Sequence, residues 1–396
     1  VEVSISGEMF QSMMTAADGA YEFDNLTAGG DYTVTPYRND DHDNGVTTFD
    51  IVLISKHVLG TQLLASPYQR IAADVNRSGT ITTLDMIQIR KLILNITTEF
   101  PNNTSWRFVE AGYDFPDVED PWAEVFPELY SVNNLDGVIT DADFVAIKVG
   151  DVNGSARANS LEDDGRSLNG TFHLEMDEQE LVAGNMYTVP VYASELAKVE
   201  GFQGTLELTG VELVDVVYGL ANVQHFGLQY AERGVITMSY DRPAGLAGED
   251  LVSSELNPLV QLVLRATTDQ SLSEALVIGS RYTVAEAYSL GGEHRSLALK
   301  VRQKTAIVEQ FELYQNTPNP VTTATLVSFT LPEAGEATLT ISDMTGRTIL
   351  LHQAEYGAGF QTINITKAQL QGVAGVLNYT LTAGEHTTTK QMVVVK

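Results

Sequence analysis

Two stretches of the sequence place oxygen-bearing side chains at the same spacing. Each is a twelve-residue loop with such side chains at positions 1, 3, 5, 9 and 12. This spacing wraps hard oxygen ligands around a calcium ion, with the backbone carbonyl of position 7 as a further ligand. The sequence therefore predicts two calcium ions. Their predicted ligands are Asn39, Asp41, Asp43, Gly45, Thr47 and Asp50 in the first loop, and Asp74, Asn76, Ser78, Thr80, Thr82 and Asp85 in the second, with Gly45 and Thr80 binding through their carbonyls.

The first loop differs from the second in its charge and at its turn. It carries three carboxylates, Asp41, Asp43 and Asp50, against two in the second loop, which predicts the tighter site. Its position 6, where glycine usually makes the sharp turn, is Asn44, and asparagine tolerates the left-handed conformation better than most residues. Because calcium relieves the repulsion between clustered carboxylates, its binding should be linked to folding. The alternative is that both loops are Asp-rich turns without metal.

Two further segments contain parts of such a loop. The segment 134–143 has acidic side chains at a suitable spacing, but Val132 stands where the first ligand should be. The segment 150–154 opens like a calcium loop and then does not continue. A third ion could take ligands from Asn134, Asp136, Asp143, Asp151 and Asn153. The alternative is that Asp136 and Asp141 make a turn and cap a helix.

Catalytic chemistry has little support in the sequence. The seven histidines are scattered and form no H-E-x-x-H pair, and there is neither a G-x-S-x-G motif nor a phosphate-binding loop. Acidic side chains are so abundant that a pair of carboxylates is no sign of a glycosidase. We therefore predict no catalytic residue and no enzymatic activity.

The composition favours an exported protein. The 396 residues carry a net charge of −29, which repels phosphates and anionic lipids and disfavours nucleic acid as a partner. The absence of cysteine excludes disulfides, thiolate catalysis and cysteine-bound zinc. No apolar run approaches the ~18 residues of a membrane span. There is no signal peptide and Val1 stands in a strand-like pattern, so we expect a processed or partial chain.

The elements around the loops predict a mainly β, multidomain fold in which β-sandwich modules flank a small α-helical calcium module. An apolar helix follows each loop, over Phe49–Leu59 and Leu84–Leu94, whereas the flanking regions alternate polar and apolar residues as strands do. The predicted domains are a partial β-sandwich at 1–38, the extended calcium module at 39–155, a polar linker at 156–167, a β-sandwich at 168–304 and a third β unit at 311–396.

The twin loops resemble a type I dockerin module, in which each of two calcium loops precedes a helix and the entering helix of an EF-hand is missing. The second loop fits that pattern at every ligand position, and the first departs from it at Asn44. The resemblance implies docking to a cohesin-type partner. The docking surface implied at loop positions 10 and 11 consists of Thr48, Phe49, Thr83 and Leu84.

Other parts of the chain resemble known modules. Residues 17–34 are similar to carboxypeptidase-regulatory-like or CnaB-like β-sandwich modules. The stretches 188–192, 199–208 and 234–240 resemble a cohesin domain, the usual partner of dockerins. Residues 313–320, 327–332, 340–347 and 390–396 resemble the type A C-terminal sorting domain of the type 9 secretion system of Bacteroidota. That resemblance implies export across the outer membrane by the secretion machinery, and an extracellular or cell-surface location.

These features predict a secreted, calcium-stabilised, non-catalytic surface protein for adhesion or assembly. A dockerin-like module of one copy that binds the sandwich of the next would make a head-to-tail contact, which propagates into a fibre. Equally, the two modules could pack within one chain as a rigid stalk. An alternative of another class is the non-catalytic C-terminal appendage of a larger secreted hydrolase, a glycosidase or peptidase.

Overall fold

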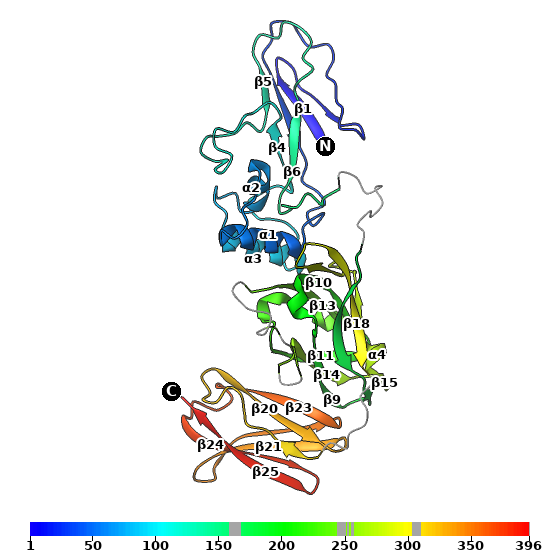
Figure 1. The fold of residues 1–396 in the computed structure, drawn as a ribbon, viewed down its shortest axis with the longest axis vertical. Coiled ribbons are helices and arrows are strands. Elements are labelled where there is room, and N and C mark those ends of the chain that lie inside the picture. Colours follow the sequence, from blue (N-terminus) through cyan, green and yellow to red (C-terminus); the bar gives the residue numbers. More distant parts are fainter. Residues whose placement is uncertain (158–167, 244–250, 252, 255–256, 303–309, 396) are drawn as a thin grey trace.

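The computed structural model describes residues 1–157, 168–243, 251, 253–254, 257–302 and 310–395. The predicted linker at 156–167 lies outside the described residues from 158 onward, as does the end of the predicted sandwich at 303–304. Four hydrophobic cores occur within the described residues. The parts that contain them follow one another along an elongated molecule, from the N-terminal sheet to the C-terminal sandwich (Figure 1).

The N-terminal sheet takes its strands from two separate parts of the sequence. Its order is β2-β1-β3-β5, formed by β1 (Glu2–Gly7), β2 (Gln11–Met14), β3 (Tyr32–Tyr37) and β5 (Tyr130–Val132). Val3 and Ile5 alternate with polar residues and bury one face of β1 against Val34. Because β5 lies inside the predicted calcium module, residues 1–38 share a sheet with that module.

The helical module follows the N-terminal sheet. It contains α1 (Thr48–Val58), α2 (Pro67–Ala73) and α3 (Thr83–Ile93), with the antiparallel pair β4 (Trp106–Glu110) and β6 (Phe144–Lys148). The predicted helices agree with α1 and α3 to within one residue at each end. The helix α2 was not predicted. It is short but has a clear start, since Ser66 caps it and Pro67 occupies its first turn. Phe100 and Phe126 pack among the helices.

The central β-sandwich spans residues 171–302. One sheet has the order β12-β13-β10-β17-β18-β7, with β16 also paired to β10, and the other contains β11, β14 and β9. Its elements are β7 (Thr171–Asp177), β8 (Glu180–Leu181), β9 (Met186–Val191), β10 (Val199–Leu208), β11 (Val211–Tyr218), β12 (Phe226–Gly227), β13 (Val235–Asp241), β14 (Val260–Ala266), β15 (Gln270–Ser271), α4 (Leu272–Ala275), β16 (Leu276–Gly279), β17 (Glu286–Ser289) and β18 (His294–Arg302), with 3-10 turns at Leu196–Lys198, Val223–His225 and Ala231–Arg233.

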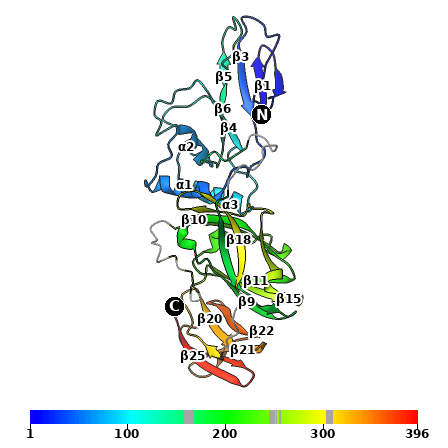
Figure 2. The ribbon, with the colours of Figure 1, turned by 45° about the vertical axis from the view of Figure 1, so that its right-hand side comes forward.

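The C-terminal sandwich lies against the far end of the central one, as both views show (Figures 1 and 2). Its strands are β19 (Glu312–Leu313), β20 (Ala324–Leu331), β21 (Gly335–Asp343), β22 (Thr348–Tyr356), β23 (Gly359–Thr366), β24 (Gly375–Ala383) and β25 (His386–Val394). Tyr356 of β22 pairs with Met186 of β9, and Thr188 hydrogen bonds with Gln361 and Thr362. The two sandwiches therefore share one sheet.

The predicted fold class, mainly β with sandwiches around a small helical module, is confirmed. No helix among the described residues has the length and apolar character that crossing a membrane requires.

Candidate docking interface and calcium loops

The second predicted calcium loop is folded around its two carboxylates. Asp74 and Asp85 are both fully buried. The N–H groups of Ser78 and Gly79 donate to the two oxygens of Asp74, at 2.8 and 2.7 Å. Asp85 accepts from the N–H of Asn76 at 3.3 Å, and burial raises the pKa of Asp85. The loop therefore brings its first and last ligand positions into one enclosed space.

The donor set of this loop fits a calcium ion. Asn76 Oδ1 is buried without a hydrogen-bond partner, so an acceptor oxygen is left for a ligand to satisfy. The remaining side chains supply carboxylate and hydroxyl oxygens, and Thr80 supplies a carbonyl, which are the ligands that calcium prefers. No group of three or more acidic or histidine side chains that could hold a metal occurs within the described residues. The second loop has only two carboxylates, Asp74 and Asp85, so it cannot form such a group by itself.

The first loop folds as predicted only in its second half. The N–H and hydroxyl of Thr47 donate to Asp50 Oδ2, at 2.8 and 2.9 Å. The predicted ligands of the first half lie elsewhere: Asn39 Oδ1 accepts from the N–H of Ser105 at 2.8 Å, and Asp41 and Asp43 are exposed. The expected left-handed turn at Asn44 is also wrong, since the residues with positive φ are Asp41 (52°) and Gly45 (74°).

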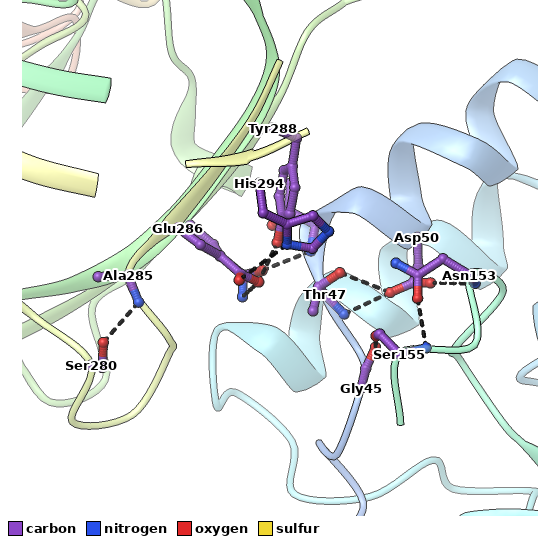
Figure 3. Close-up of polar contacts among 12 residues, drawn as sticks. Gly45, Thr47, Asp50, Asn153, Ser155, Ser280, Ala285, Glu286, Tyr288 and His294 are labelled. Carbon is purple, nitrogen blue, oxygen red and sulfur yellow. Dashed lines mark hydrogen bonds and ion pairs between the residues drawn. The ribbon is translucent and has the colours of Figure 1, made fainter. Parts of the chain in front are cut away.

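A distant segment takes the place of that first half. The N–H groups of Val152 and Asn153 donate to Asp50 Oδ1, at 2.8 and 3.3 Å (Figure 3). Burial, together with the neighbouring Asp151 carboxylate, raises the pKa of Asp50 to about 8, although hydrogen bonds from Thr47 and Val152 lower it. Asp151 and Asn153, predicted as parts of a third site, thus lie at the first loop.

The rest of the predicted third loop is not assembled. Asn134, Asp136 and Asp143 are exposed in the segment between β5 and β6. The N–H of Asn134 donates to Asp31 of the N-terminal sheet at 2.8 Å. The segment leads into strand β6, so the expectation that Asp136 and Asp141 cap a helix is wrong.

The start of α1 docks onto the central sandwich of the same chain. The N–H of Thr48 donates to Gln203 Oε1 at 2.7 Å, and the hydroxyl of Thr48 lies 2.7 Å from that of Ser239. The ring of Phe49 stacks on Tyr288, with ring centroids 5.1 Å apart, and meets the edge of His294 at 6.1 Å. The α1 contacts therefore fall on β10, β13, β17 and β18, all of one sheet.

The end of α3 docks onto the same sheet through its free carbonyls. The last carbonyls of a helix have no partner within it and need donors from outside. The hydroxyl of Thr283 donates to the carbonyl of Ile93 at 2.7 Å. The hydroxyl of Thr237 and the amide of Gln229 both donate to the carbonyl of Leu94, each at 2.7 Å. The sandwich thereby caps the helix.

Two ion pairs frame the interface. Lys56 of α1 pairs with Glu200 at 2.8 Å. Arg90 of α3 pairs with Asp241, whose carboxylate also lies 3.7 Å from His225 Nε2. Burial works to raise the pKa of Asp241, but the neighbouring His225 side chain and the charge of Arg90 outweigh it and lower that pKa. The Arg90–Asp241 pair is mostly buried, with side chains 8% and 14% exposed.

The predicted docking residues divide into two groups. Thr48 and Phe49 contact the sandwich, whereas Thr83 is exposed and Leu84 is 52% exposed. No residue of the sandwich side was predicted from the sequence. Gln203 and Ser239 lie on β10 and β13, within stretches that resemble cohesins, whereas Tyr288 and His294 lie on β17 and β18, outside those stretches. Strand alternation alone does not tell which face of a sheet receives a partner.

Phe49 and Leu84 occupy the same position in the two repeats and so form a matched pair for a test. We expect Phe49→Ala to weaken docking by about 2 kcal/mol, because it removes a half-buried ring that stacks on the buried Tyr288 at an interface. Leu84→Ala should stay within about 0.5 kcal/mol. Amide hydrogen exchange of β10 and β13 in the full chain measures the difference. Equal protection in the two variants would mean that Phe49 does not hold the modules together.

One comparison with known proteins finds a family match within the helical module. Residues 41–94 match the family model of the dockerin type I domain. The comparison with curated proteins gives no match. Among solved structures, the chain is similar to the seventh ScaB type I cohesin from Pseudobacteroides cellulosolvens (13% identity over 35% of this chain and 97% of that chain, TM-score 0.23). It is also similar to a type I cohesin–dockerin complex from Clostridium thermocellum (13% identity, 36% and 100%, TM-score 0.27). A third is the non-cellulosomal cohesin from Archaeoglobus fulgidus (15% identity, 34% and 93%, TM-score 0.21). The family match shows that residues 41–94, which contain α1 and α3, are similar to the dockerin type I domain.

Proposed function

We propose that this chain is a secreted, non-catalytic surface protein in which a calcium-loaded dockerin-like module docks onto the cohesin-like sandwich of the same chain. The docked pair forms a rigid segment of a stalk that presents or spaces an adhesive part of the molecule.

The observation that carries this proposal is the position of α1 and α3 on the β10–β13–β17 sheet. Apolar, hydrogen-bonded and ionic contacts all join the modules: Phe49 stacks on Tyr288, Thr48 bonds Gln203, and Arg90 pairs with Asp241. An interface with a packed aromatic anchor and buried polar pairs is typical of specific association.

Calcium has a structural role in this proposal. The second ion takes oxygens from Asp74, Asn76, Ser78, the Thr80 carbonyl, Thr82 and Asp85. Asp85 also accepts from the N–H of Thr82 at 2.9 Å, which caps the start of α3. An ion that neutralises Asp74 and Asp85 therefore stabilises the helix whose far end meets the sandwich.

Export rests on the resemblance of residues 311–396 to a type 9 sorting domain. In the structure these residues form a sandwich with its own core, attached to the central one through β9 and β22. We propose that the secretion machinery reads this sandwich and delivers the chain to the cell surface.

The head-to-tail fibre is less well supported than the self-docked stalk. The sandwich face that a second copy would need is covered by the helices of the same chain, so a fibre requires the copies to exchange modules. The other alternative, an appendage of a secreted hydrolase, would use the same rigid stalk and differs in carrying a catalytic domain upstream of Val1.

Sedimentation of the full chain at several concentrations tests the self-docked arrangement. We expect a monomer at every concentration in calcium, because the docking contacts are satisfied within one chain. Growth in mass with concentration that calcium promotes and a chelator reverses would show docking between copies, and the proposal of a self-docked stalk would then be wrong.

A further inference from the structure

The segment that begins at Asp151 repeats the opening of the second calcium loop in its residue types. The second loop starts Asp74-Val75-Asn76-Arg77-Ser78, and the later segment reads Asp151-Val152-Asn153-Gly154-Ser155. Loop positions 1, 3 and 5 therefore carry aspartate, asparagine and serine in both. Within the described residues, the segment that begins at Asp151 is not followed by a helix and has no acidic residue of its own for position 12.

The backbone of the two segments is folded alike. In the second loop the N–H groups of positions 5 and 6 donate to the two oxygens of Asp74, at 2.8 and 2.7 Å. In the later segment the N–H groups of the same positions donate to the two oxygens of Asp151, at 3.1 and 2.7 Å. Position 4 is left-handed in each, with φ of 57° at Arg77 and 73° at Gly154.

The missing second half is supplied by residues 45–50. Asp50 Oδ2 accepts from the N–H and hydroxyl of Thr47 at 2.8 and 2.9 Å, as Asp85 Oδ2 does from Thr82 at 2.9 and 3.1 Å. The Oδ1 atom of each aspartate accepts from the N–H of position 3, at 3.3 Å in both cases. Residues 45–50 thus take the places of loop positions 7–12, and the segment that begins at Asp151 takes the places of positions 1–6.

The junction between the two segments explains why glycine follows Asn44. The hydroxyl of Ser155 donates to the carbonyl of Gly45 at 3.0 Å, and position 5 donates to position 7 in the second loop at 3.2 Å. Asn44 and Arg157 exchange two hydrogen bonds, at 2.8 and 3.1 Å. A Cβ on Gly45 would lie 2.5 Å from the nitrogen of Ala156. Positions 6 and 7 belong here to two separate segments, so no tight turn joins them. Position 6 therefore does not need glycine and is Ala156.

Two buried carboxylates face each other at this junction. Asp50 is fully buried and Asp151 is 7% exposed. The donors to Asp50 are neutral N–H and hydroxyl groups. The ammonium of Lys148 is close enough to attract Asp151, but its hydrogen bonds go to the carbonyls of His42 and Val149, at 2.7 and 3.4 Å. Buried charges need a charged partner or a metal.

A cavity of about 330 Å³ gives access to the same place. Gly45, Thr47 and Ser155 are among the residues that line it on the side of the helical module, and Gln203 and Tyr282 are among those on the side of the sandwich. The cavity thus reaches three of the residues at the junction. Asp41 and Asp43 line it as well, whereas Asp50, Asp151 and Asn153 are not among its lining residues.

We propose that the first calcium site of the module is discontinuous. Its ligands are Asp151, Asn153 and Ser155 from one segment, and the Gly45 carbonyl, Thr47 and Asp50 from another. This inference rests on the proposed calcium binding and deepens it. The two sites then have the same number of carboxylates, so the expectation that the first is tighter loses its basis.

An ion at this site would join the two ends of the helical module. One segment immediately precedes α1, whose Thr48 and Phe49 contact the sandwich, and the other immediately precedes the connection toward the sandwich. Calcium at the first site would therefore hold these two segments together next to the docking interface.

Calcium stoichiometry of the full chain, measured by isothermal titration, tests the proposal. Wild type should bind two ions. Asp151→Asn should bind one, because it removes one of the two carboxylates of the first site, and the double variant Asp41→Asn/Asp43→Asn should still bind two. Asp85→Asn should bind one through loss of the second site, and Asp85→Asn combined with Asp151→Asn should bind none.

Hydrogen exchange locates the lost ion, so loss of one site can be told apart from unfolding of the whole module. In Asp151→Asn, calcium should no longer protect residues 45–50 but should still protect residues 74–85. Loss of an ion in the Asp41/Asp43 variant with two ions kept in Asp151→Asn would support the continuous loop and overturn the discontinuous site. A wild-type chain that binds no calcium would instead refute the proposed calcium binding itself.

Discussion

Arg90→Ala is expected to undock the helical module from the sandwich. The guanidinium of Arg90 is the charged partner of Asp241 in a mostly buried pair. Removing one member of such a pair leaves the other buried without compensation, at a cost of about 3–5 kcal/mol. Small-angle scattering of the full chain should show a longer, more variable particle.

The neighbouring Lys91→Ala supplies the control for this prediction, because Lys91 is exposed on the same helix. It should leave the scattering profile unchanged. Asp241→Ala and the double variant complete a mutant cycle, in which the double variant should lose less than the sum of the single ones. Additive losses would mean that Arg90 and Asp241 do not act as a pair, and the ionic contribution to docking would have to be abandoned.

The local parts of this fold could be read from the sequence. The helices α1 and α3 follow from apolar residues at helical spacing behind an acid-rich loop, and both signals lie within a few turns of chain. The second calcium loop is equally local, since all its ligand positions fall between Asp74 and Asp85. The helix α2 was missed because seven residues are too few for a periodic signal to stand out.

The first loop shows where reading from the sequence stops. Asp41 and Asp43 directly precede residues 45–50, so a continuous loop was the natural prediction, and Asp151 was recognised only as an opening without a continuation. Joining Asp151 to Asp50 requires a contact about a hundred residues apart in the chain, which no local pattern encodes. The repeated Asp-Val-Asn-x-Ser opening was the available signal, and Ser155 was missed although it completes that repeat.

The receiving face of the sandwich was hidden for a different reason. Strand alternation separates buried from exposed side chains but does not rank the exposed ones. Gln203 and Ser239 are polar residues in strands, and in the structure both are buried under α1. The helices make them interior residues, so only the docked arrangement reveals their role.

Removal of calcium is expected to destabilise the helical module far more than either sandwich. A ligand present at a hundred times its dissociation constant stabilises the folded state by about 2.7 kcal/mol per site, so two ions contribute about 5 kcal/mol. That is a large part of the ~5–15 kcal/mol of a typical domain. Calorimetry of the full chain in calcium and then in excess chelator should show one transition falling sharply. We assign that transition to residues 39–157.

The two sandwiches provide the internal control for chelation, because their cores contain neither calcium loop. Chelation should also expose the sheet that α1 and α3 cover, since an unfolded module cannot present Thr48 and Phe49 to it. Amide exchange should therefore rise at residues 45–50 and 74–85 first, and at Gln203 and Ser239 of β10 and β13 as a consequence. If β10 and β13 stay protected while the calcium loops open, the module docks without its ions. Calcium would then stabilise the loops without controlling the joint between the modules.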